Sequence, residues 1–254
     1  MTAVADHYDQ LLAANYTWML GGDLETVTEA QAGLLRELGV APRPGGKAAA
    51  VDLGSGPGPQ TLALTRLGFT SVTAVDTSAT LLGELVDHAT RVGAAEAVHA
   101  VRSDIRGSLP SLTTPGSVSA IVCMGDTLPH LPSRKDVRTL IADAAEALDE
   151  GGSFVVSFRD LTGELLGTER FIPVRGTDDR ILTCFLDYVD EDTVLVHDLL
   201  HTRRDGAWHL TTGSYPKLRL APTWVADQCR AAGLVIRHDE TGPRGMHVLH
   251  AVKP

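Results

Sequence analysis

Basic residues are outnumbered in this chain, and long apolar runs are absent from it. Asp and Glu number 32 against 22 Lys and Arg, which gives a formal net charge of −10. A surface with this balance offers no positive field to a phosphate backbone, so we expect no nucleic-acid partner. No apolar stretch approaches the roughly 20 residues that a membrane-spanning helix needs, so we expect no membrane partner. These absences favour a globular protein that acts on a small molecule.

Cysteine is also scarce. Cys123, Cys184 and Cys229 lie far apart in apolar sequence and have no metal-ligand spacing. The first ten residues, MTAVADHYDQ, lack the basic segment and apolar core of a secretion signal, so we expect a cytoplasmic location. His197 and His201 would share one face of a strand, but no carboxylate or cysteine completes a known spacing, and we predict no metal site.

Strand-like and helical patterns alternate along much of the chain. Its 254 residues, 43% of them hydrophobic, suit one α/β domain with an insertion. Apolar, β-branched runs predict strands at 48–53, 71–75, 97–102, 118–124 and 153–158. Helical periodicity predicts helices at 60–67, 79–92 and 133–148. This order is typical of a doubly wound, mostly parallel seven-stranded Rossmann-like sheet.

Four segments follow from this pattern. We expect a helical lid at 1–46, with helices over about 4–20 and 24–38, and a core at 47–162. Between 163 and 220, β-rich runs separated by turn signals predict an antiparallel insert. We expect 221–254 to complete the sheet with a helix at 222–232 and strands at 234–238 and 246–253.

The sequence VDLGSGPG, from Val51 to Gly58, joins the first predicted strand to the helix after it. Its three glycines remove the Cβ atoms that would keep a ligand from the backbone of the turn. A nicotinamide dinucleotide fingerprint needs Gly or Ala where this chain has Pro59, which opposes a dehydrogenase. Asp76 ends the second strand about 20 residues further on, where a carboxylate can accept both hydroxyls of a ribose.

The DxGxGxG form resembles motif I of the class I S-adenosylmethionine (SAM) methyltransferases. That resemblance implies that the loop wraps the methionine part of SAM. Asp104 would hold the adenine amino group and Ile105 would lie on the ring. The cofactor-binding residues expected on this basis are Tyr16, Asp52, Gly54, Ser55, Gly56, Gly58, Asp76, Thr77, Asp104, Ile105, Met124 and Gly125.

Three further stretches, CMGDTLPHL, SFVVSFRDL and LTTGSYPKLRL, are similar to the glycine and sarcosine N-methyltransferases. The resemblance implies that Arg159 clamps an acceptor carboxylate, that Tyr215 lies near the reacting nitrogen and that His130 can take a proton. The chain departs from that family at Asp126, where Asn is usual, and at Lys217, where His is frequent.

Other roles remain open for these side chains. Arg159 could form a surface salt bridge, Tyr215 could be an ordinary strand residue, and His130 could bond a backbone carbonyl. Tyr16 and Trp18 could be packing residues of the lid, since aromatic side chains dominate packing in general.

The leading hypothesis for function is a small-molecule methyltransferase, N-directed, with SAM as cofactor. The alternatives are an O-methyltransferase of a natural product, a SAM-binding protein without catalysis, and a Rossmann oxidoreductase, which Pro59 and Asp104 oppose. A homo-oligomer is compatible with the sequence.

Overall fold

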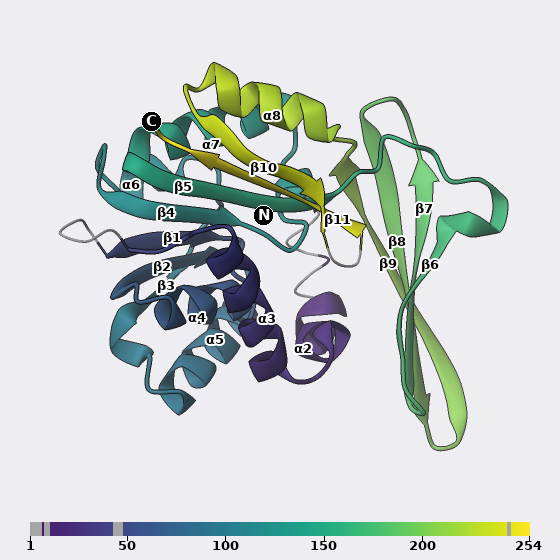
Figure 1. The fold of residues 1–254 in the computed structure, drawn as a ribbon. Coiled ribbons are helices and arrows are strands. Elements are labelled where there is room, and N and C mark those ends of the chain that lie inside the picture. Colours follow the sequence, from purple (N-terminus) through teal and green to yellow (C-terminus); the bar gives the residue numbers. More distant parts are fainter. Residues whose placement is uncertain (1–6, 8–10, 43–47, 243–244) are drawn as a thin grey trace.

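A seven-stranded sheet occupies the centre of the computed structural model, which describes residues 7, 11–42, 48–242 and 245–254 (Figure 1). The strand order is β10-β11-β5-β4-β1-β2-β3. The strands are β1 (Ala49–Leu53), β2 (Ser71–Asp76), β3 (Val98–Arg102), β4 (Val118–Cys123), β5 (Leu148–Arg159), β10 (Val235–Thr241) and β11 (Met246–Val252). Strands β1 to β5 pair in parallel, whereas β11 runs antiparallel to both β5 and β10. The predicted doubly wound, mostly parallel sheet is confirmed.

Helices cover both faces of this sheet (Figure 1). One face is packed by α3 (Leu24–Glu37), α4 (Pro59–Arg66) and α5 (Ala79–Arg91). The other face is packed by α6 (Ser108–Leu112), α7 (Arg134–Ala147) and α8 (Pro222–Ala231). Local signals set several helix starts. Ser78 and Ser133 accept hydrogen bonds from the first-turn amides of α5 and α7, and Pro59 opens α4.

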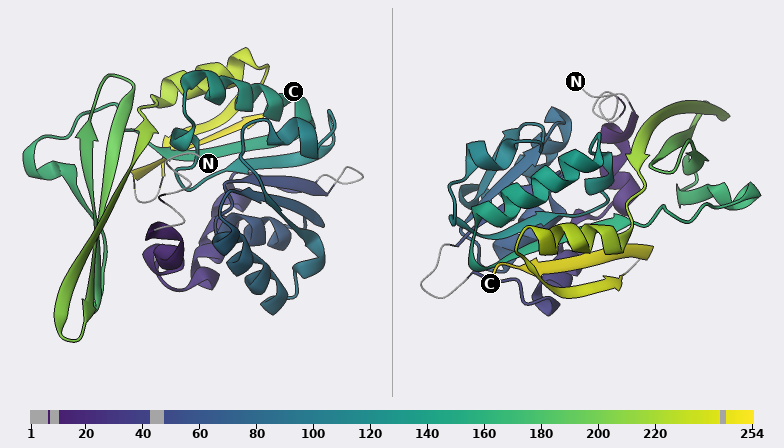
Figure 2. Two further views of the ribbon diagram at one scale, coloured as in Figure 1. Left: turned by 180° about the vertical axis from the view of Figure 1, so that it is seen from behind. Right: turned by 90° about the horizontal axis from the view of Figure 1, so that it is seen from above.

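The β-rich insert forms a separate four-stranded antiparallel sheet that projects from one end of the core (Figures 1 and 2). Its strands are β6 (Phe171–Gly176), β7 (Arg180–Tyr188), β8 (Thr193–Arg204) and β9 (Ala207–Leu218). Arg219 joins the two ends of the insert, because its guanidinium donates to the carbonyls of Leu161 and Thr162. The predicted antiparallel meander is therefore present, and its exit lies beside its entry.

Two predicted elements differ from the structure. The helix expected over 4–20 lies partly outside the described residues, and the described part is a 3-10 turn, Ala13–Asn15, followed by the short helix α2 (Tyr16–Leu20). The Asn15 side chain donates to the Leu11 carbonyl, and Gly21 and Gly22 end α2 with positive φ. Strand β5 begins at Leu148 rather than at residue 153, since a register shift against β4 lets it start early.

No helix among the described residues is long and apolar enough to cross a membrane.

Candidate functional site

The glycine turn after β1 is shaped by close packing. Gly54, Gly56 and Gly58 all have positive φ, between +54° and +94°, a region that favours glycine. A Cβ at Gly54 would collide with Thr127, and one at Gly58 would collide with Leu85 of α5. The turn is tied to β2 because the amides of Gly54 and Ser55 both donate to the Val75 carbonyl, at 2.8 and 3.0 Å.

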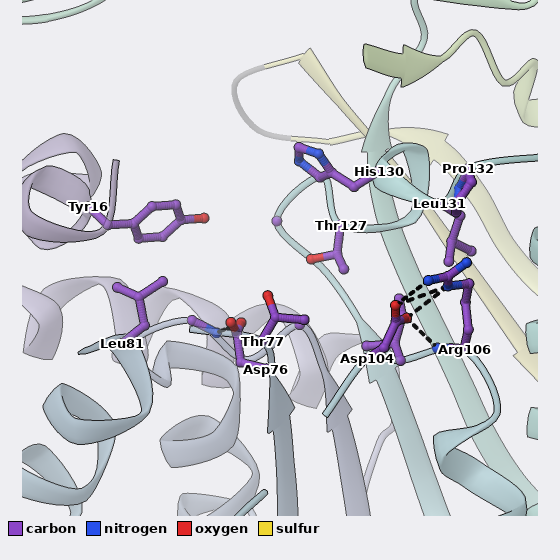
Figure 3. A pocket seen from close by; sticks show the side chains of 14 residues that line it. Tyr16, Asp76, Thr77, Leu81, Asp104, Arg106, Thr127, His130, Leu131 and Pro132 are labelled. Carbon is purple, nitrogen blue, oxygen red and sulfur yellow. Dashed lines mark hydrogen bonds and ion pairs between the residues drawn. The ribbon is translucent and has the colours of Figure 1, made fainter. Parts of the chain in front are cut away.

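A cavity opens beside this turn (Figure 3). It lies at the carboxyl ends of β1 and β4, where the strand order reverses and where open α/β sheets bind ligands. Its lining residues are Tyr16, Gly54, Gly56, Asp76, Thr77, Leu81, Asp104, Ile105, Arg106, Gly125, Thr127, His130, Leu131 and Pro132.

Asp76 lies at the floor of the cavity, at the end of β2. Its carboxylate accepts hydrogen bonds from the backbone amides of Gly56, at 2.8 Å, and Ser78, at 2.9 Å. These bonds fix the carboxylate in place, and a carboxylate has further lone pairs that can accept hydroxyl groups. The glycine cradle and this carboxylate fit the ribose and methionine parts of SAM.

Asp104 lines the far end of the cavity and is held by a residue that the sequence reasoning missed (Figure 3). The Arg106 guanidinium binds both carboxylate oxygens, with Nη2 2.6 Å from Oδ2, and the Arg106 amide donates to Oδ1 at 2.9 Å. Burial opposes ionisation of Asp104, but these bonds lower its pKa below the usual value. An ionised acceptor beside the apolar Ile105 suits the adenine amino group and ring.

Tyr16 reaches the cavity from the lid, where α2 places it opposite the glycine turn (Figure 3). Its hydroxyl is buried and is near the charges of Asp76 and Asp126, and all three raise its pKa. Helix α2 is held to the core by Thr17, which donates to Glu84 of α5 at 2.6 Å. Tyr16 is therefore a neutral phenol in a position to cover a bound cofactor.

Four of the expected cofactor residues do not line the cavity: Asp52, Ser55, Gly58 and Met124. Asp52 is only 1% exposed and accepts a hydrogen bond from Thr61 of α4 at 2.6 Å. Burial raises its pKa to about 7, although the bond from Thr61 opposes this shift. In this structure Asp52 joins the turn to α4, and Gly58 makes room for Leu85.

His130 lines the end of the cavity that meets the insert. Its ring lies 5.2 Å from that of Tyr215 on β9, which in turn lies 4.8 Å from the ring of His7. Burial, Lys217 and His7 lower the pKa of His130 well below the usual value, in that order of size. The imidazole is therefore neutral near neutral pH and is a weak base.

Three charged residues next to these rings, Lys217, Asp126 and Arg159, are linked to one another through Asp126. Lys217 forms an ion pair with Asp126, and its Nζ is 5.8 Å from the Tyr215 ring centroid. Arg159 ends β5 with an exposed side chain outside the cavity lining, and its amide donates to Asp126 at 2.9 Å. Burial and Asp198 raise the pKa of the Cys184 thiol on β7, and the charges of Lys217 and Arg159 oppose this shift.

Sequence reasoning also missed Leu81, Thr127, Leu131 and Pro132, which belong to helices and loops around the cavity. Thr127, Leu131 and Pro132 flank His130 in the stretch already assigned to the site, and that proximity was the available signal. Among the described residues, no group of three His, Cys, Asp or Glu side chains is arranged to hold a metal ion.

Comparison with known proteins adds a domain assignment. Residues 50–152 match the family model of a methyltransferase domain. No curated protein sequence matches the chain.

The whole chain is similar in fold to several solved structures. The CcbJ methyltransferase from Streptomyces caelestis is 21% identical, with 98% of this chain and 95% of that chain covered and a TM-score of 0.72. CalS10, an amino pentose methyltransferase from Micromonospora echinaspora, is 15% identical over 96% and 97% of the two chains, with a TM-score of 0.70. A SAM-dependent methyltransferase from Clostridium acetobutylicum is 16% identical over 98% and 97%, with a TM-score of 0.68.

Proposed function

We propose that this chain, in which residues 50–152 match a methyltransferase domain, is an enzyme that transfers the methyl group of SAM to a nitrogen atom of a small-molecule acceptor. The observation that carries the proposal is the place of His130, which lines the cavity at the end that meets the insert. An amine can attack only in its neutral form, and it must lose a proton after the new bond forms. The neutral imidazole of His130 can accept a hydrogen bond from the attacking amine and orient it, and the proton then passes to water.

The other residues bind and orient. Asp76 would accept hydrogen bonds from the ribose hydroxyls, and Asp104 would accept one from the adenine amino group. Tyr16 would cover the cofactor on the lid side and exclude water. SAM supplies a sulfonium that activates its methyl group, so the protein must chiefly hold the nucleophile in line. One of the solved structures of similar fold is an amino pentose methyltransferase, which agrees with a nitrogen acceptor.

Arg159 would hold an anionic group of the acceptor. It stands at the carboxyl end of β5, and the parallel strands β1 and β4 end at the same edge of the sheet, where the glycine turn lies. A guanidinium binds a carboxylate through two parallel hydrogen bonds, which fixes the direction of the acceptor as well as its place.

The test is a screen of amines, amino acids, amino sugars and phenols as methyl acceptors. Turnover of SAM is measured by the release of S-adenosylhomocysteine. We expect turnover with at least one amine and a product whose mass rises by one methylene unit on nitrogen. Turnover with phenols or alcohols alone would replace the proposal by O-methylation. Tight SAM binding without turnover of any acceptor would indicate a binding protein.

A further inference from the structure

Lys217 and Asp126 form a nearly buried ion pair on the acceptor side of the site. Lys217 lies on the inner face of β9, and Asp126 lies in the loop after β4. Their side chains are 9% and 13% exposed. Removing two charges from water is costly, and the pair is tolerated because each charge compensates the other. These are the two positions at which the chain departs from the family that it resembles.

The position of the Asp126 carboxylate is fixed from two sides. Its backbone adopts φ of 74°, which is uncommon for a residue with a side chain, and its Oδ1 accepts from the Arg159 amide at 2.9 Å. Its Oδ2 accepts from Lys217. Asp126 follows Gly125, which lines the cofactor cavity, and its charge raises the pKa of the Tyr16 hydroxyl. The pair therefore lies next to the residues that line the cavity, although neither side chain is among them.

Lys217 has donor capacity beyond this pair. An ammonium carries three N–H groups, and among the described residues Nζ has one hydrogen-bond partner, Asp126. The Tyr215 ring contacts both Lys217 and His130, with centroid distances of 5.8 and 5.2 Å. One ring therefore joins Lys217 to the residue that lines the end of the cavity.

We propose that Lys217 donates a hydrogen bond to a hydroxyl oxygen of the acceptor, and that the enzyme thereby selects amines with a hydroxyl group close to the nitrogen. This inference rests on the proposed function. Because Asp126 balances the charge of Lys217, this part of the site suits a neutral oxygen, whereas an anionic group of the acceptor would be held by Arg159. An amine without that oxygen would leave buried N–H groups without a partner, which a polar site penalises.

The probes for the test are trans-2-aminocyclohexanol and cyclohexylamine, which differ by one hydroxyl group. Binding to the S-adenosylhomocysteine complex is measured by calorimetry, and turnover with SAM is measured separately. We expect the native protein to favour the amino alcohol over cyclohexylamine by at least about tenfold.

The variants are Lys217→Met, Asp126→Asn and the two combined, with the exposed Lys135→Met as control. The double variant removes both charges together, so it avoids leaving one buried charge alone. We expect it to lose the preference for the amino alcohol while it keeps its affinity for S-adenosylhomocysteine. The control should keep the preference.

The inference fails if the native protein binds the two amines equally or binds neither. It also fails if the double variant keeps the preference. The proposed function fails separately. If the amino alcohol binds preferentially but no amine is methylated, only the proposed N-methyltransferase function is rejected. If both amines are methylated with equal efficiency, only the role of Lys217 is rejected.

Discussion

At the scale of single residues, Asp76 carries the most direct test of cofactor binding. Its carboxylate faces the cavity while two backbone amides hold it. Asp76→Ala should weaken SAM binding by about 1.5–3 kcal/mol, the usual value of hydrogen bonds to a charged group. Calorimetry on the folded variant measures this, with the exposed Asp87→Ala as control. Unchanged affinity would remove Asp76 from the ribose site.

Arg159 tests the acceptor rather than the cofactor. Arg159→Lys keeps the charge but loses the two parallel hydrogen bonds of the guanidinium. With an identified acceptor, kcat/KM should fall at least about tenfold, or roughly 1.4 kcal/mol, while SAM affinity stays near native. The exposed Arg237→Lys is the control. Equal activity on an acceptor whose carboxylate is masked as an amide would exclude the clamp.

Asp52 makes the stability of the fold depend on pH. Its pKa is about 7 in the folded protein and near 3.8 in the unfolded chain, so folding favours the protonated form. Protonated Asp52 therefore contributes its whole stabilisation to the free energy of unfolding below about pH 3.8. This stabilisation is lost as the pH rises through the folded pKa of about 7.

The free energy of unfolding of the native protein should therefore fall by on the order of 4 kcal/mol between roughly pH 4 and pH 8 because of Asp52, and Asp52→Asn should abolish this fall. Urea unfolding of the native and variant proteins at both pH values measures the difference, because the other titrating groups are common to both. Asp87→Asn is the control. Parallel pH profiles for the native protein and Asp52→Asn would show that Asp52 is already ionised.

At the scale of elements, the insert should be separable from cofactor binding. Arg219 holds the entry and exit of the insert together, so a short Gly/Ser linker can replace residues 164–217. We expect this variant to retain SAM binding and to lose methyl transfer, because Tyr215 and Lys217 leave with β9. Calorimetry and the turnover assay measure the two properties.

The control trims only the outer end of the β8–β9 hairpin, at residues 203–208, and should keep both properties. Joint loss of SAM binding and turnover in the linker variant would mean that the insert is part of the core.

The elements that the sequence predicted correctly are those with local causes. The glycine turn, the strand ends at Asp76 and Asp104 and the meander of the insert all follow from backbone geometry and short-range pattern. The broken lid helix was missed because Asn15 and the paired glycines after α2 act against the apolar periodicity.

The glycines and acids of the candidate site were predictable, but the side-chain contacts that hold it were not. Arg106 folds back on Asp104 two residues away, which no spacing signals by itself. The pairing of Lys217 with Asp126 joins residues 91 positions apart, so it depends on how the insert docks on the core. Asp52 accepts a hydrogen bond from Thr61 of α4, a side-chain contact that the motif alone does not indicate.

At the scale of the whole molecule, helix α2 connects three parts. Tyr16 faces the cavity, Thr17 bonds to α5 of the core, and Trp18 contacts the insert, where Arg175 and Arg180 lie 5.6 and 5.2 Å from its ring centroid. The cofactor cavity is thus mechanically linked to the insert through one short helix.

Trp18→Leu should loosen this link and weaken SAM binding about 2–10-fold, since each cation–π contact contributes about 0.5–1 kcal/mol. Trp208→Leu, which changes an exposed tryptophan of the insert, should leave SAM affinity unchanged. Calorimetry of both variants measures the effect. Equal affinities would mean that the core alone positions Tyr16.

A cytoplasmic location, a homo-oligomer and the absence of nucleic-acid partners stay predictions.

The place of β11 has a consequence for synthesis of the chain. β11 pairs with β5 on one side and β10 on the other, so β10 has no place in the sheet until residues 246–252 have been made. A nascent chain on the ribosome therefore carries the whole cofactor half with the edge of β5 unpaired, and an open strand edge is a template for aggregation. Translation that stalls before residue 246 should yield a product that depends on chaperones.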